Sequence, residues 1–188
     1  MKINEKTSKV MHAEADGVRF AYRVYGSGGG VPVFKIILVA TAPRGGVGVA
    51  YIKDVFYNAL DKDEDPRLSL FYNDMPIGKE ILMRINARSE NRVPQTSLKS
   101  IKAQIVALVD WSVACVEGFG YLREISHEIL VVNGKDDRMF PAENSHILFE
   151  HLPNAFLSLY QASGHGVIFL YALRFAREAI AFYKGSQK

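Results

Sequence analysis

Residues 133–166 have the sequence NGKDDRMFPAENSHILFEHLPNAFLSLYQASGHG. This stretch begins at the end of one apolar run, residues 128–134, and contains a second, residues 155–162. Pro141 opens a helical pattern between them, and a last amphipathic segment extends from Val167 to Gly185. The predicted order of strand, helix, strand and helix is typical of a parallel sheet covered by helices.

Two acids and a histidine follow the predicted strands. Asp136 and Asp137 come after the first strand and His165 after the second. Because the carboxyl ends of parallel strands meet at one edge of a sheet, we expect these side chains to lie close together. A carboxylate can fix the tautomer of a histidine and stabilise its charged form, so Asp137 and His165 are candidates for acid-base work. The alternative is that Asp137 caps the next helix and His165 is a polar turn residue.

The first half of the chain supplies further strands and then helices. MHAEA and VRFAYRVY flank Asp16-Gly17, which is a strong signal for a hairpin. After the glycines of residues 26–30, an apolar run predicts a buried strand over residues 35–41. Between Gly48 and about Val116, apolar residues recur at three and four positions, which predicts about four helices.

Composition narrows the class of protein. The chain has 188 residues, of which 48% are hydrophobic, and this predicts a single domain over residues 1–188. The net charge of +3 is spread along the chain, so we expect no nucleic-acid partner. One cysteine and five scattered histidines predict no internal disulfide and no metal. The glycines of residues 26–30 match neither a phosphate loop nor G-x-G-x-x-G, so we expect no cofactor. Without a secretory leader pattern or an apolar run of about 20 residues, we expect a cytoplasmic protein with no membrane span.

The same stretch resembles the C-terminal third of α/β-hydrolase fold proteins, with an acid in a G-x-x-D turn and a histidine in a G-H-G turn. The resemblance implies that Asp137 is the acid and His165 the base. Residues 11–33 resemble the opening hairpin and the start of the third strand of that family, and KIILVATAPRGG resembles the strand that leads into a helical cap. The resemblance therefore implies that residues 48–121 form a cap.

The segment that should carry the nucleophile is absent. In the family, G-x-S-x-G places a serine on a sharp turn, whereas here the third strand continues directly into Phe34 and the next strand. No serine in this chain has glycine both two residues before it and two residues after it: Ser27, Ser112 and Ser163 all lack this pattern. Ser27 and Thr41 remain weak candidates for a nucleophile, and water activated by the Asp-His pair is a third.

Loss of that segment predicts a reduced α/β-hydrolase-like sheet of about five mostly parallel strands, with an N-terminal hairpin, flanking helices and the cap. Apolar surface and a strand edge would then be bare, so we expect a homodimer.

Two functions remain open. The first is weak, esterase-type hydrolysis of small acyl esters by Asp137 and His165. The second is a catalytically inactive relative that binds a small hydrophobic ligand or a protein partner. A deletion without selected function is disfavoured, because strands, caps and turns are locally consistent.

Overall fold

The computed structural model describes residues 10–15, 18–23, 34–87, 97–113 and 118–185. Its strands are β1 (Val10–Ala15), β2 (Val18–Arg23), β3 (Lys35–Val39), β4 (Glu128–Gly134) and β5 (Ala155–Tyr160). Its α-helices are α1 (Ile52–Leu60), α2 (Pro66–Tyr72), α3 (Pro76–Asn86), α4 (Leu98–Ser112), α5 (Glu143–His151), α6 (Val167–Leu170) and α7 (Ala172–Lys184). Two 3₁₀ helices, η1 (Val49–Tyr51) and η2 (Gly120–Glu124), flank the run of helices from α1 to α4.

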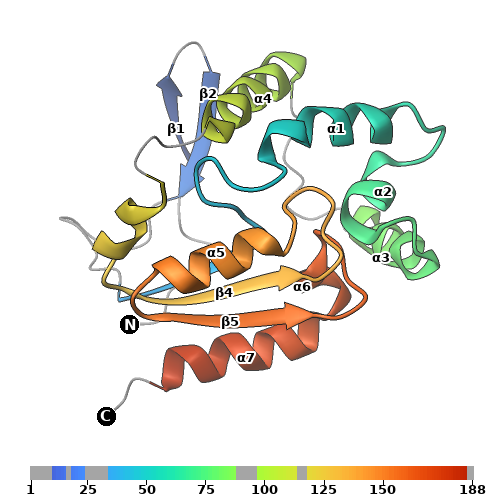
Figure 1. Ribbon diagram of the computed structural model, residues 1–188. Helices are drawn as coiled ribbons and strands as arrows, with labels where there is room; N and C mark the ends of the chain where they lie inside the picture. The colour runs from blue at the N-terminus through green and yellow to red at the C-terminus, as the bar shows by residue number, and fades with distance from the viewer. Residues whose placement is uncertain (1–9, 16–17, 24–33, 88–96, 114–117, 186–188) are drawn as a thin grey trace.

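Strands β3, β4 and β5 form a parallel sheet in that order. Ile37 pairs with Leu130, and Val131 pairs with Leu157. Helix α5 covers one face of the sheet and α7 the other (Figure 1). The strand predicted over residues 128–134 is β4, and its residues from Ile129 to Gly134 are buried because β4 lies between two strands and two helices.

The single sheet of about five strands is not confirmed. Among the described residues, β1 and β2 form an antiparallel hairpin of their own, apart from the three-stranded parallel sheet. The hairpin is the one that the sequence predicted, although its Asp16-Gly17 turn lies outside the described residues. Hydrogen bonding between β3 and the hairpin was expected because loss of the segment between them would bring the two side by side, and such loss does not by itself produce strand pairing. As a result, β3 is an edge strand within the part of the chain that the structure describes.

Helices α1 to α4 occupy the chain between β3 and β4, as the periodicity predicted. Proline begins both α2 and α3, where its missing N–H costs no helical hydrogen bond. Helix α4 is shorter than the apolar pattern suggested, because Val113 takes an extended conformation after Ser112. Among the described residues, none of the helices combines the length and the apolar character that crossing a membrane requires.

The C-terminal segment forms two helices instead of one. Tyr171 leaves the helical conformation, with φ of −115° and ψ of 38°, and separates α6 from α7. Its hydroxyl donates a hydrogen bond to the carbonyl of Gln161, and its ring lies 5.3 Å from that of Tyr160. These contacts tie the helix break to the end of β5.

Tyr160 is fully buried at the end of β5 and donates a hydrogen bond of 2.5 Å to Oε2 of Glu178 on α7. Burial, and after it the hydrogen bond to Glu178, raise the pKa of Tyr160 to about 12. An unfolded tyrosine ionises near pH 10, so the stabilisation from this neutral hydroxyl is complete below pH 10 and is lost as pH rises towards about 12.

We therefore expect the stability advantage of the wild type over Tyr160→Phe to shrink between about pH 9 and about pH 11. Urea unfolding of both proteins at the two pH values measures it. Tyr183→Phe is the control, because Tyr183 is 55% exposed. A constant difference between wild type and Tyr160→Phe would contradict the assignment.

Candidate functional site

Asp137 is held in a rigid turn after β4. Its side chain is fully buried, and its Oδ1 accepts hydrogen bonds from the backbone N–H groups of Met139 (2.8 Å) and Phe140 (3.0 Å). The local sequence Asp-Arg-Met-Phe forms this turn because an aspartate can accept from backbone groups two and three residues ahead. The other carboxylate oxygen, Oδ2, is left to face the next loop.

His165 meets that oxygen. Nδ1 of His165 lies 3.0 Å from Oδ2 of Asp137, and the His165 side chain is 19% exposed. A carboxylate can only accept, so in the neutral imidazole Nδ1 carries the proton and Nε2 keeps its lone pair. Nε2 makes no hydrogen bond to any residue that the structure describes. The structure thus brings together the two residues that the sequence singled out.

Two phenylalanines contact the imidazole. The Phe71 ring centroid lies 5.4 Å from that of His165, and the Phe140 centroid lies 5.6 Å away. Phe140 immediately follows the turn of Asp137, whereas Phe71 comes from α2. Sequence reasoning missed both residues. The position of Phe140 near Asp137 gave a weak signal, but nothing in the sequence linked Phe71 to His165.

Helix α2 is fixed against the histidine loop by polar contacts. The N–H of Gly166 donates to the carbonyl of Phe71 at 2.8 Å, and the Asn73 side chain donates to the carbonyl of Asp136 at 2.8 Å. A Cβ on Gly166 would lie 2.9 Å from the Phe71 carbonyl oxygen, so the second glycine of G-H-G allows this close approach. The backbone of Asp136 therefore has a structural contact, while its side chain is exposed.

The ends of α2 have local stabilising features. Asp65 caps the N-terminus by accepting from the N–H of Arg67, and Asn73 ends the helix in a left-handed conformation with φ of 50°. Hydrogen bonding to the Arg67 side chain lowers the pKa of Asp65, and the same pairing raises the pKa of Arg67. These features hold Phe71 in place beside His165.

A mostly apolar cavity of about 480 Å³ is bordered by Phe140, whose ring contacts His165. Phe140 forms part of its wall, together with Thr41 after β3 and Leu108 and Trp111 on α4. The indole N–H of Trp111 donates to the carbonyl of Ala42 at 3.3 Å, and the N–H of Gly45 donates to the carbonyl of Trp111 at 2.8 Å. Helix α4 is thereby fastened to the loop after β3, and the cavity lies between them.

The two weak nucleophile candidates have different outcomes. Thr41 lies on the cavity wall, but within the described part of the chain no hydrogen bond joins it to His165. Ser27 lies outside the described residues. Ser163 is fully buried before the histidine loop, and its hydroxyl faces the carbonyl of Gly164 at 3.4 Å.

Comparison with known proteins points to one fold. No family model matches the chain, and no curated protein matches it. The structure is similar to an α/β-hydrolase fold protein from Chitinophaga pinensis, with a TM-score of 0.73 and 28% identity over 83% of this chain and 57% of that chain.

Two more distant likenesses agree. An α/β-hydrolase enzyme from a Medee basin deep-sea metagenome library matches with a TM-score of 0.58 and 17% identity, over 82% of this chain and 57% of that chain. An esterase from Exiguobacterium antarcticum matches with a TM-score of 0.54 and 17% identity, over 81% and 57%. The chain thus spans a little more than half the length of these solved proteins, and it has the α/β-hydrolase fold in a shortened form that lacks the G-x-S-x-G segment.

Proposed function

We propose that the protein is a weak hydrolase of small acyl esters in which Asp137 and His165 act as a general-base pair. The observation that carries the proposal is the contact of 3.0 Å between Asp137 Oδ2 and His165 Nδ1, which directs the lone pair of Nε2 away from the carboxylate. The apolar cavity beside Phe140 is of a size that suits a small ligand.

The proposed reaction uses water as the nucleophile. Nε2 of His165 takes a proton from a water molecule while the oxygen attacks the ester carbonyl, and Asp137 stabilises the resulting imidazolium. The tetrahedral intermediate then expels the alcohol, which receives the proton from His165. Without a G-x-S-x-G turn to supply a serine and its neighbouring N–H groups, we expect slow turnover, because one missing oxyanion donor typically costs about 10²–10³ in rate.

We propose that residues 48–121 act as a cap that shapes the substrate pocket. Within them, α2 supplies Phe71 against His165, and α4 supplies Leu108 and Trp111 to the cavity wall. These apolar side chains favour a short hydrophobic acyl group over a charged one. The structural similarity to an esterase supports this choice of substrate class.

Hydrolysis of p-nitrophenyl acetate tests the proposal. We expect His165→Ala to lower the rate above background by about 10²-fold or more, since a positioned general base contributes about 10²–10⁴-fold. Exposed histidines also hydrolyse this ester slowly, so His146→Ala is the matched control, because His146 is exposed on α5. Equal losses in both variants, or no loss in either, would refute catalysis by the pair.

The second candidate function is binding without turnover. It is favoured by the apolar cavity together with an Nε2 that has no hydroxyl partner among the described residues. Trp111, the only tryptophan of the chain, lies on the cavity wall and reports on its occupancy. If a non-hydrolysable ketone such as 2-octanone changes Trp111 fluorescence equally in wild type and His165→Ala, while neither hydrolyses esters, the protein is a binder.

A further inference from the structure

Strand β3 presents an unpaired hydrogen-bonding edge. The sheet order places β4 on one side of β3, and no other strand among the described residues pairs with it. The N–H of Ala40 donates to Val132 on β4. Backbone groups alternate in direction along a strand. The N–H and C=O groups of Ile36 and Leu38 therefore also point to β4, whereas those of Lys35, Ile37 and Val39 point away from it.

The composition of β3 is that of an interior strand. Four of its five residues, KIILV, are apolar, and they lie on both faces of the strand. All five residues are only half-buried. Ile36 and Leu38 pack on the α5 side of the sheet, and Ile37 and Val39 on the α7 side. A run that is apolar on both faces is typical of a strand with neighbours on both sides.

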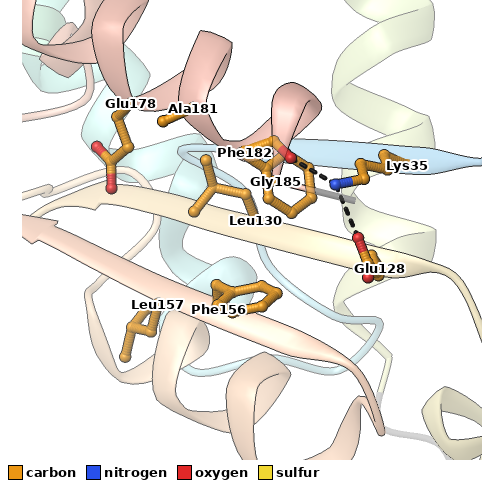
Figure 2. Close-up of a pocket in the computed structure, with 9 residues that line it drawn as sticks. All are labelled: Lys35, Glu128, Leu130, Phe156, Leu157, Glu178, Ala181, Phe182 and Gly185. Carbon is orange, nitrogen blue, oxygen red and sulfur yellow. Dashed lines mark hydrogen bonds and ion pairs between the residues drawn. The ribbon is translucent and has the colours of Figure 1, made fainter. Parts of the chain in front are cut away.

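No exposed charged side chain of β3 lies at this edge. The ammonium of Lys35, the one charged residue of β3, lies under α7, where it is 2.8 Å from Oε2 of Glu128 and donates to the carbonyl of Phe182 (Figure 2). The Lys35 side chain is 8% exposed. An outward lysine or a proline is among the features that prevent pairing at the edge strands of soluble proteins, and Lys35–Val39 has neither.

We propose that β3 pairs antiparallel with β3 of a second copy of this chain, in a register centred on Ile37. This register sets Ile37 opposite Ile37 and Lys35 opposite Val39 of the other copy. The three outward-facing residues then form three facing pairs, each exchanging two backbone hydrogen bonds, roughly six in total. The pairing is isologous, as a twofold dimer requires.

The same register continues both cores across the interface. Ile36 meets Leu38 of the second copy on the α5 side, so the apolar layer on that face becomes continuous. On the α7 side, Ile37 meets Ile37 of the second copy next to the apolar cluster between the sheet and α7. Phe34, which is 77% exposed, is brought opposite Ala40 of the second copy, next to Thr41 on the cavity wall.

The other edge of the sheet is less suited to pairing. Strand β5 has Ser158 among its apolar residues. The guanidinium of Arg174 lies 4.2 Å from the ring centroid of Tyr160 at the end of β5, which places a positive charge beside that strand. This contrast favours β3 as the interface, and the inference does not depend on the proposed function.

The test compares two proline variants at matched positions of the two edges. By the same alternation, Leu157 points its N–H away from β4, because Asn154 and Tyr160 direct their carbonyls to β4. In each variant proline therefore removes an outward N–H and no hydrogen bond of the sheet. Analytical ultracentrifugation at micromolar concentration should give a dimer of about 42 kDa, twice 21.0 kDa, for the wild type and Leu157→Pro, and a monomer for Ile37→Pro.

A wild-type monomer would overturn the proposal, and so would a dimer that Leu157→Pro breaks and Ile37→Pro does not. If either variant fails to fold, hydrogen exchange of the wild type decides. Raising the protein concentration from about 1 μM to about 100 μM should slow exchange at Ile37 and Val39 by up to about 10-fold, because the monomer fraction falls with the square root of concentration, and should leave Leu157 unchanged. Exchange at Ile37 that does not depend on concentration would equally refute the dimer.

Discussion

Gly134→Ala is expected to destabilise the protein by about 3 kcal/mol, at the upper end of the range for overpacking. A Cβ at this position would lie 2.3 Å from the carbonyl oxygens of both Ser163 and Gly164. Both oxygens belong to the backbone of the loop that carries His165, so they cannot rotate away as a side chain would. The strand end of Gly134 and the His165 loop would have to separate.

Thermal unfolding measures the effect, since about 3 kcal/mol should lower the melting temperature of a chain of this size by roughly 6–12 °C. Gly120→Ala is the matched control, because a Cβ on Gly120 would have no neighbour within 4 Å. It should change stability by less than about 0.5 kcal/mol. Similar melting temperatures for both variants would show that the two loops do not approach each other this closely.

Asp137→Asn is expected to abolish ester hydrolysis while the turn survives. The asparagine carbonyl can still accept from the N–H groups of Met139 and Phe140. Its amide N–H would then face Nδ1 of His165, which would have to accept. The imidazole proton would move to Nε2, which would then have no lone pair to accept a proton from water. We therefore expect the rate above background to fall by about 10²-fold or more.

Asp137→Ala separates the catalytic role from the structural one. It leaves both backbone N–H groups without their acceptor, which should cost about 2–5 kcal/mol of unfolding free energy. Asp137→Asn should cost about 1 kcal/mol. Urea unfolding and p-nitrophenyl acetate hydrolysis, measured on both variants, distinguish the roles. A fully active Asp137→Asn would show that the carboxylate does not orient His165 for catalysis.

Local sequence predicted the elements of the C-terminal half well. Strand β4 has the predicted bounds, because a run apolar on both faces favours a buried strand. The approach of Asp137 to His165 followed from the parallel order of two strands. By contrast, the break at Tyr171 depends on contacts with Gln161 and Tyr160, which a helical periodicity does not record.

The surroundings of the Asp-His pair could not be predicted in the same way. Phe71 reaches His165 because α2 packs on the G-H-G loop, and that contact joins segments almost 100 residues apart. The cavity is likewise formed by α4 and the loop after β3. Packing of this kind depends on the summed shape of many side chains, and local propensity carries no information about it.

The sequence by itself determined the parallel strand-helix order, the Asp137-His165 pair and the absence of a G-x-S-x-G serine, because each rests on short-range pattern or on residue identity. Only the tertiary structure decided that, among the described residues, β3 lies at the edge of a three-stranded sheet and the hairpin stands apart from it. Strands that pair come from segments that are far apart in the sequence. Which of them pair depends on which strand edges the rest of the fold leaves uncovered.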